Sequence, residues 1–218
     1  MGGLQDPILG QKSQFDVVGD KPFVQILHDG NNNAGHWVTV SNVQTPPSHD
    51  IELHDSMSGP PNTYIKWQCS SILMTIRPSI EMALNTTQRQ KGGIDCGLYA
   101  IAAATSLCFG VYPNEGQFDQ SQLRQHLLSC LEEGSMSLFP CLAPAAKPNV
   151  KRISIPVNST CRLFDNTKER MAECSICMEW YHQSCLGVST EHFMRIERAQ
   201  VWRCPEAGCR AGDLGEFD

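Results

Sequence analysis

The sequence lacks an excess of positive charge and any long apolar run. Residues 1–145 hold 7 basic and 13 acidic residues, a net charge of −6, and residues 146–218 hold 10 of each kind. Proteins that bind along nucleic-acid phosphates carry a basic surface, so we expect no direct nucleic-acid binding. No apolar run approaches the ~20 residues that cross a membrane, so we expect no membrane partner.

A recognisable targeting segment is also missing. Residues 1–6 have neither the charged and apolar regions of a secretory signal nor the Ser or Thr at position 6 that N-myristoylation requires. We therefore expect an intracellular protein. A nuclear location is expected too, although the basic residues between positions 147 and 152 are too sparse to form a nuclear signal.

Cysteine, in contrast, is abundant and unevenly placed. The chain has 11 cysteines, and most of them follow position 140. Cys174 and Cys177 form a Cys-x-x-Cys pair close to His182, which without a secretory signal favours zinc over disulfides. Three cysteines of the first half lie in apolar surroundings and are interpreted as buried structural thiols: Cys69, Cys108 and Cys130.

Hydrophobic periodicity predicts an α+β first domain, a small antiparallel or mixed sheet with flanking helices. The expected strands are residues 23–27, 36–40, 51–54 and 80–84. The expected helices are residues 62–74, 98–109 and a last one that a capping box at 119–122 opens and Gly134 ends. We expect this domain to span residues 1–138. Residues 139–157, with four prolines, are interpreted as a linker, and residues 158–212 as a small second domain.

Cys96 is the first candidate for chemistry. It lies between Asp95 and Gly97, directly before an alanine-rich apolar run that is typical of a helix. A helix N-terminus favours a negative charge, and the thiolate is the form of cysteine that attacks carbonyl groups. The alternative is a buried cysteine that merely begins a core helix.

A nucleophilic cysteine requires a base and an orienting group. His36, at the start of a predicted strand, is a candidate base. Asp55, at the end of another predicted strand, could accept a hydrogen bond from His36 and so fix the tautomer of its imidazole. Gln90 could donate its amide to an oxyanion. Each has a structural alternative: His36 could be a surface or core residue, Asp55 a turn-forming residue and Gln90 a solvated polar residue. Three further histidines compete for the role of base: His28, His49 and His54.

The combined order His-Trp, Asp, then Gln-x4-Asp-Cys-Gly resembles the ubiquitin-like-protein-specific (SUMO/sentrin-type) cysteine proteases over roughly residues 20–135. Papain itself has its catalytic residues in a different order. The resemblance implies a fold of the papain-like cysteine protease superfamily, of the ubiquitin-like protease type. It also implies roles for four residues: His36 as general base, Asp55 as its orienting group, Cys96 as nucleophile and Gln90 in the oxyanion hole.

The same resemblance implies hydrolysis of a peptide or isopeptide bond after the Gly-Gly of a ubiquitin-like modifier, or of a protein carrying one. Trp37 would flank the channel for the Gly-Gly tail, and Gly97 would allow close packing. Family members commonly have helices before the first strand, so this domain is expected to be N-terminally truncated or minimal. The tryptophan-lined surface that grips a modifier is not recognisable.

The second domain carries zinc-ligand spacing, Cys-x2-Cys-x4-His-x2-Cys from position 174 to 185. A domain of about 55 residues has too small a core to fold without such help. The candidate metal ligands are Cys161, Cys174, Cys177, His182, Cys185, Cys204 and Cys209.

This pattern, with Trp180 and Trp202, resembles a PHD finger over residues 159–209; a RING finger is the alternative. The resemblance implies one complete zinc site, formed by the ligands at 174, 177, 204 and 209. The second site, with the ligands at 161, 182 and 185, lacks a fourth ligand, because Ser159 stands where the family has a cysteine.

Some PHD fingers bind histone tails, which makes a histone tail or another peptide the expected partner of the second domain. Trp180 falls at a position that in the family can contact methyl-lysine; the alternative is a core residue, which is what we expect for Trp202. No second wall for such a site is recognisable.

The sequence therefore predicts a cysteine peptidase followed by a zinc finger that recognises targets. The alternative is a binding protein, catalytically inactive or derived from a mobile element, in which the finger mediates the interaction. A finger acting as a ligase module is the third interpretation.

Overall fold

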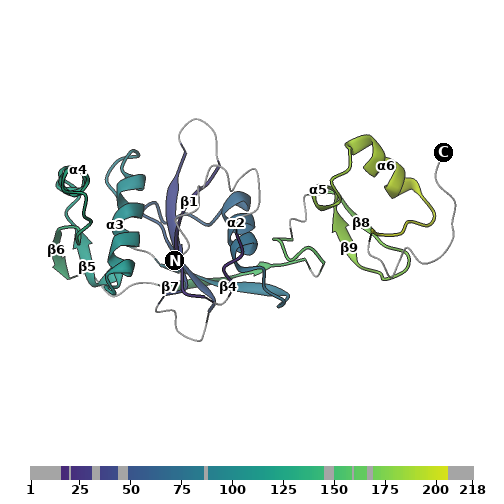
Figure 1. The fold of residues 1–218 in the computed structure, drawn as a ribbon, viewed down its shortest axis with the longest axis horizontal. Coiled ribbons are helices and arrows are strands. Elements are labelled where there is room, and N and C mark those ends of the chain that lie inside the picture. The colour runs from purple at the N-terminus through teal and green to yellow at the C-terminus, as the bar shows by residue number, and fades with distance from the viewer. Residues whose placement is uncertain are drawn as a thin grey trace.

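The structure is a computed structural model of the 218-residue chain. It describes residues 16–19, 21–30, 35–43, 49–85, 88–144, 150–158, 160–165 and 169–205. Figure 1 shows a larger unit around a sheet and a smaller unit at one end, formed by the last quarter of the chain. No helix among the described residues has the length and apolar character needed to cross a membrane.

A five-stranded sheet with the order β1-β2-β3-β4-β7 forms the centre of the larger unit. Neighbouring strands are antiparallel, except that β3 and β4 are parallel. The four predicted strands are confirmed. The strands are β1 (Val24–His28), β2 (Trp37–Ser41), β3 (Ile51–His54), β4 (Ser79–Asn85) and β7 (Val150–Pro156).

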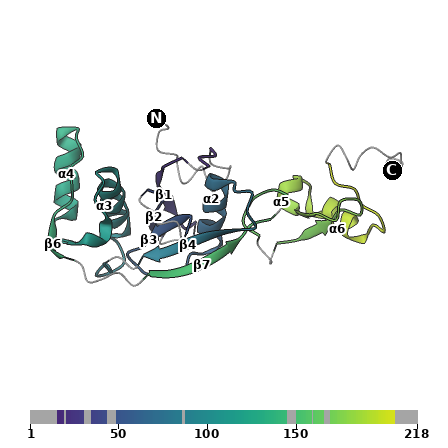
Figure 2. The same ribbon diagram turned by 90° about the horizontal axis from the view of Figure 1, so that it is seen from below.

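The two faces of the sheet differ in chemistry, and each is covered by one helix (Figure 2). On one face, apolar residues of all five strands pack against Ile65, Cys69 and Ile72 of α2 (Thr63–Leu73) in the main core cluster. Burial of this apolar surface is the main source of stability for the unit. The predicted helix is confirmed, with Asn62 as its N-cap accepting the backbone N–H of Ile65.

The opposite face is largely polar and lies against α3 (Cys96–Cys108). Thr39 and His54 are cross-strand partners there, as are Ser41 and Glu52. The hydroxyl of Thr39 donates to the backbone carbonyl of Ala100 in α3 at 2.7 Å. Because the alanine side chains are small, the backbone of α3 lies close enough to the sheet to accept hydrogen bonds from its polar side chains.

Beyond α3 lies the end of the molecule farthest from the second unit (Figure 1). It comprises η1 (Pro113–Glu115), the two-stranded sheet of β5 (Gly116–Phe118) and β6 (Cys141–Pro144), and α4 (Leu123–Glu133). Gly134 ends α4 in the left-handed conformation, as predicted. The predicted capping box is wrong: the N-cap is Gln122, which makes no side-chain capping bond, and Asp119 instead accepts bonds from Ser121 and Gln122 within the preceding turn.

The predicted linker over 139–157 is wrong in part. Its residues 150–156 form β7, which pairs with β4 from Ser79↔Pro156 to Asn85↔Val150. Ile155 is fully buried in the main core cluster. A proline is tolerated here because Pro156 stands at the end of an edge strand. Residues 145–149 of the predicted linker lie outside the described residues.

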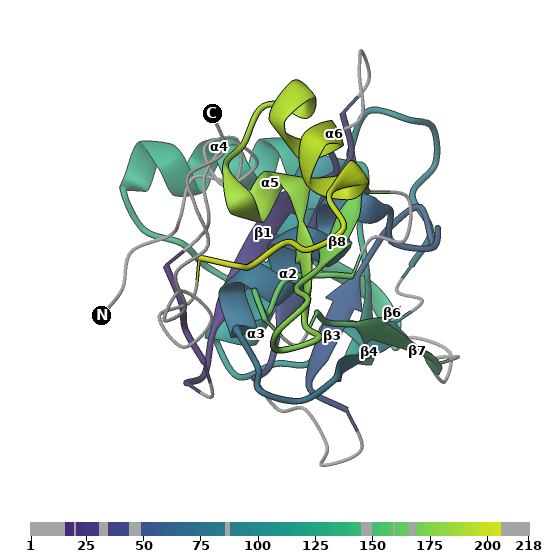
Figure 3. The ribbon, with the colours of Figure 1, turned by 90° about the vertical axis from the view of Figure 1, so that its right-hand side faces the viewer.

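The smaller unit contains β8 (Met171–Glu173), β9 (Trp180–His182), α5 (Gln183–Leu186) and α6 (Thr190–Arg198). The two strands are antiparallel, and Figure 3 shows α5 and α6 beside them, in front of the large sheet. Within the part of the unit that the structure describes, its core cluster has three buried members, Cys174, Tyr181 and Cys204. So small a core agrees with the expectation that metal ligands stabilise this domain. The α+β character of the chain is confirmed.

Candidate functional site

Three elements bring the candidate cysteine, histidine and aspartate to one end of the sheet. His36 directly precedes β2, Asp55 directly follows the antiparallel β3, and Cys96 is the first residue of α3. Because β2 and β3 are antiparallel neighbours, the start of one lies beside the end of the other. The start of α3 at Cys96 confirms the predicted helix N-terminus.

His36 is bound to Asp55. Its Nε2 lies 2.6 Å from Oδ1 of Asp55. This hydrogen bond is the largest cause of a raised pKa for His36, to about 9, against the lowering effect of burial. A hydrogen bond with Cys96 raises the pKa further. The raised pKa of His36 thus reflects both the carboxylate of Asp55 and the thiol of Cys96.

Asp55 is held as a carboxylate. Burial alone would raise its pKa, but the hydrogen bond from His36 and those from two backbone N–H groups outweigh burial, so the net pKa is lowered. The donors are the N–H of Met57 at 2.7 Å and the N–H of Gly59 at 3.0 Å. Asp55 is therefore both a turn former and the partner of the histidine.

Cys96 is 6% exposed, and its Sγ lies 4.0 Å from the backbone carbonyl of Gly35. Gly35 is a glycine for steric reasons, since a Cβ there would stand 2.1 Å from Nε2 of His28. The segment that carries His36 thus runs close to the thiol, and the missing side chain at position 35 leaves room for the ring of His28.

Gln90 is buried and bound to its own loop. Its Oε1 accepts the hydroxyl of Ser56 at 2.7 Å, and its Nε2 donates to the carbonyl of Gly92 at 3.0 Å. Gln90 is therefore not a solvated residue, which was its structural alternative. These bonds tie it to the segment after Asp55, and its part in an oxyanion hole stays a prediction.

Trp37 and Gly97 are neighbours in space. A Cβ at Gly97 would lie 3.7 Å from Cδ1 of Trp37, which is ordinary van der Waals contact. The packing of the chain therefore does not require a glycine at position 97, and the expectation that Gly97 is needed for close packing is wrong. The ring of Trp37 also lies against His28, with ring centroids 4.6 Å apart.

The competing histidines have partners of their own. His28 contacts Trp37, and Nε2 of His49 lies 2.9 Å from Oε1 of Glu52. His54 is buried 3.7 Å from the other oxygen of Glu52, and burial lowers its pKa to about 4. Of the four candidate bases, His36 is the one that the structure brings to Cys96.

Gln120 was missed by the sequence interpretation. Its side chain binds both the N–H and the carbonyl of Lys91, each at 2.8 Å, and donates to Oδ2 of Asp95 at 2.7 Å. It therefore fixes both ends of the loop that leads into Cys96. In the sequence, the only feature that distinguished Gln120 was its position in the turn before α4. Polar residues are common in such turns, so this feature did not indicate a functional role.

The first cluster of metal-binding side chains in the small unit comprises Cys174, Cys177 and Cys204. The Sγ atoms of Cys177 and Cys204 are 3.8 Å apart, and the N–H of Cys204 donates to Sγ of Cys174 at 3.3 Å. Burial opposes ionisation of Cys174, but backbone N–H donors, Cys177 first, lower its pKa to about 6. A thiolate held by N–H groups is the form that binds zinc.

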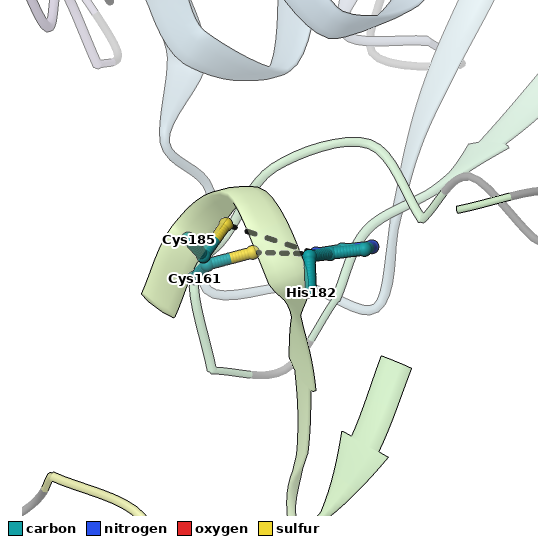
Figure 4. A group of neighbouring side chains, drawn as sticks. All are labelled: Cys161, His182 and Cys185. Carbon is teal, nitrogen blue, oxygen red and sulfur yellow. Dashed lines mark hydrogen bonds between the residues drawn. The ribbon is translucent and has the colours of Figure 1, made fainter. Parts of the chain in front are cut away.

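The second cluster comprises Cys161, His182 and Cys185 (Figure 4). Nδ1 of His182 lies 3.4 Å from Sγ of Cys161 and 3.8 Å from Sγ of Cys185. The hydrogen bond with Cys185 is the main cause that lowers the pKa of Cys161 to about 5. Six of the seven predicted ligands thus form two groups, divided as the resemblance implied; Cys209 and Ser159 lie outside the described residues.

The two tryptophans of the small unit have different surroundings. Trp202 is partly buried and packs edge-on against Tyr181, with ring centroids 5.6 Å apart. Trp180 begins β9 and is 47% exposed, so it is not the core residue of the structural alternative. Its cross-strand partner is the exposed Glu173 of β8. A carboxylate therefore stands beside an exposed aromatic ring.

Comparison with known proteins identifies the small unit. Residues 159–207 match the family model of the PHD-finger, so the chain contains a PHD finger, and this finger binds zinc. The finger region is 36% identical over 52 residues to "Histone lysine demethylase PHF8" of Danio rerio and 35% identical over 52 residues to "Lysine-specific demethylase phf2" of the same species. Each match covers 24% of this chain and 5% of the relative.

The larger unit has no such identification. No solved structure matched the chain. The matches to the family model and to the two relatives concern the finger and give no support to a ubiquitin-like-specific protease or to a papain-like fold. The grouping of His36, Asp55 and Cys96 is therefore an observation of geometry, and their catalytic roles are proposals.

Proposed function

We propose that this chain binds the basic tail of another protein through its PHD finger, with a histone tail as the first candidate. The match of residues 159–207 to the PHD-finger family carries this proposal. The names of the two relatives, a histone lysine demethylase and a lysine-specific demethylase, point to lysine-bearing protein partners. Such a partner would place the protein at chromatin, in agreement with the expected nuclear location.

The surface of the finger offers two features for such a tail. Among the described residues, the small sheet has only β8 and β9, and at the edge of β9 the carbonyl of Trp180 already accepts the side-chain amide of Asn158, so an added strand would pair with β8. Next to it, Glu173 and Trp180 stand opposite each other across the two strands. A carboxylate and an indole face together favour a cation such as a lysine or methyl-lysine side chain.

The test is calorimetric titration of the full-length, zinc-loaded chain with histone tail peptides that differ in lysine methylation. We expect one peptide to bind, and we expect Trp180→Ala to weaken it at least ~5-fold. Phe109→Ala changes a comparably exposed aromatic residue outside the finger and is the matched control. Binding of none of the peptides, or equal binding by Trp180→Ala, would refute the proposal.

A second function, cysteine peptidase, is favoured by the 2.6 Å contact between His36 and Asp55, together with the contribution of Cys96 to the raised pKa of His36. In this proposal Sγ of Cys96 attacks a peptide or isopeptide carbonyl and forms a thioester. His36 gives its proton to the leaving amine, and water then hydrolyses the thioester. Cleavage after the Gly-Gly of a ubiquitin-like modifier is the substrate class that the sequence resemblance suggests.

Ubiquitin-like modifiers with a thiol-reactive C-terminus test this second proposal by intact mass. An adduct on the wild type, absent from Cys96→Ala and kept by Cys108→Ala, supports it. Cys108 lies at the other end of the same helix and is an exposed thiol, so its interpretation as a buried residue is wrong. If no modifier reacts, the rate of alkylation of Cys96 by iodoacetamide at pH 7 decides between a different substrate and an inactive site. A rate no faster than that of Cys108 would indicate an inactive site.

A further inference from the structure

Ser56 and Gln90 are joined by two hydrogen bonds, although 34 positions of the sequence separate them. The backbone N–H of Gln90 donates to the carbonyl of Ser56 at 3.0 Å, and the hydroxyl of Ser56 donates to Oε1 of Gln90 at 2.7 Å. Both residues are buried. Ser56 directly follows Asp55, so the turn that holds the partner of His36 also holds the side chain of Gln90.

These contacts determine the orientation of the Gln90 amide. Its Nε2 donates to the carbonyl of Gly92 at 3.0 Å, and a carbonyl can only accept, so the nitrogen faces Gly92 and the oxygen faces Ser56. An amide nitrogen carries two hydrogens. Gly92 accepts one of them, and no contact within the described ranges accepts the other. The amide therefore keeps one N–H for a group that enters the site.

We propose that Ser56 is a positioning residue for peptide cleavage: its hydroxyl holds the Gln90 amide so that the free N–H donates to the oxyanion formed at Cys96. This inference rests on the second proposed function, the cysteine peptidase. Gly92 belongs to the loop that leads into Cys96, so the amide lies between this loop and the turn after Asp55. An oxyanion donor is effective because its direction is set before the reaction. Without the hydroxyl, the amide would lose the bond that fixes its oxygen end.

The ester p-nitrophenyl acetate tests the proposal without knowledge of the natural substrate. Sγ of Cys96 attacks the ester carbonyl, the resulting oxyanion collapses and p-nitrophenolate leaves, so the sulfur keeps the acetyl group and the thiol proton passes to the buffer. Iodoacetamide reacts with the same thiol by losing iodide from a saturated carbon, and no oxyanion forms. The ratio of the two rates therefore reports the oxyanion donor separately from the reactivity of the thiol.

Peptide mass spectrometry of the full-length, zinc-loaded chain measures both rates at Cys96. Ser56→Ala should slow acetylation at least ~10-fold and leave alkylation unchanged, since outright removal of an oxyanion donor costs about 100-fold or more. In the background of Gln90→Ala, Ser56→Ala should slow acetylation no further, because the amide that it positions is absent. The control is Ser41→Ala, which removes a buried, hydrogen-bonded hydroxyl from the last residue of β2 and should change neither rate.

A matched pair, Ser56→Thr and Ser56→Val, replaces Ser56→Ala if that variant does not fold. The two new side chains have nearly the same shape, and only threonine carries a hydroxyl. Acetylation of Cys96 should be at least ~10-fold faster in Ser56→Thr than in Ser56→Val, with equal alkylation rates.

The outcomes separate this inference from the peptidase proposal. Acetylation that Ser56→Ala leaves unchanged, or that falls only in parallel with alkylation, would overturn the role of Ser56. A further loss in the background of Gln90→Ala, or equal acetylation of Ser56→Thr and Ser56→Val, would do the same. Acetylation of wild-type Cys96 no faster than that of the exposed Cys108 would refute the peptidase function itself, and this inference with it.

Discussion

The backbone N–H of Phe164 donates to Oγ of Ser70 at 2.7 Å, across 94 positions of the sequence. The phenyl ring packs against the main core cluster, and Nζ of Lys66 lies 5.3 Å from the ring centroid. Ser70 and Lys66 belong to α2 in the larger unit, whereas Phe164 lies within the PHD finger match. The finger is therefore joined to the larger unit through a packed contact.

Replacing Phe164 by alanine should destabilise the larger unit by about 2 kcal/mol, roughly half the cost for a fully buried phenylalanine, because this ring is only partly buried. Urea unfolding measures the difference. Phe109→Ala, which removes an exposed ring, should cost less than about 0.5 kcal/mol. Equal stability of Phe164→Ala and the wild type would contradict a packed contact.

Asp55→Asn should lower the pKa of His36 from about 9 by ~1 unit or more, because the bond to Asp55 is the largest cause of the shift. NMR titration of the imidazole measures it. The raised pKa stabilises the fold fully below pH 6.5, and this stabilisation is lost as pH rises through about 9. The variant should therefore lose less stability over that range, and an unchanged pKa would refute the assigned cause.

Gln120→Ala should loosen the loop before Cys96, because it removes three hydrogen bonds to Lys91 and Asp95. Amide hydrogen exchange of residues 91–95 should rise at least ~5-fold, since each lost bond is worth about 1 kcal/mol. Gln125→Ala, at an exposed position of α4, is the control. Unchanged exchange in Gln120→Ala would show that the loop is held by other contacts.

His54→Phe should make the protein less sensitive to acid. Burial lowers the pKa of His54 to about 4, so between pH 6.5 and 4 the unfolded chain binds a proton that the native chain does not. Stability falls there by up to ~1.4 kcal/mol per pH unit for this one group. The variant, compared with the wild type by urea unfolding at pH 7 and pH 5, should lose less; equal losses would contradict the assignment.

Removing zinc should unfold the finger while the larger unit keeps its sheet. The buried residues of the finger include Tyr181, Phe193 and two of its metal-binding cysteines, whereas the sheet has a larger apolar core of its own. Hydrogen exchange with and without a strong chelator should show lost protection in β8 and β9 and little change in β2 and β3. Protection of β8 and β9 that survives chelation would show that the finger does not depend on its metal.

The first four strands, the start of α3 at Cys96 and the spacing of the zinc ligands were predictable from sequence. Each depends on residues a few positions apart: alternation in a strand, a glycine-rich turn before an apolar run, or Cys-x2-Cys in a turn. The candidate catalytic residues were selected by their order along the chain. The structure then distinguished His36 from His49 and His54, which lie in a network around Glu52.

Tertiary structure decided the rest. The prolines around β7 indicated a linker, yet Ile155 is buried because β4, some 70 positions earlier, offers an unpaired edge and an apolar face. The contacts of Gln120 with Lys91 and of Phe164 with Ser70 likewise join segments that no local pattern relates. Such pairings depend on the shape of the folded surfaces and on the polar groups that these surfaces leave without partners. Because these surfaces exist only in the folded chain, no local sequence pattern predicts the pairings.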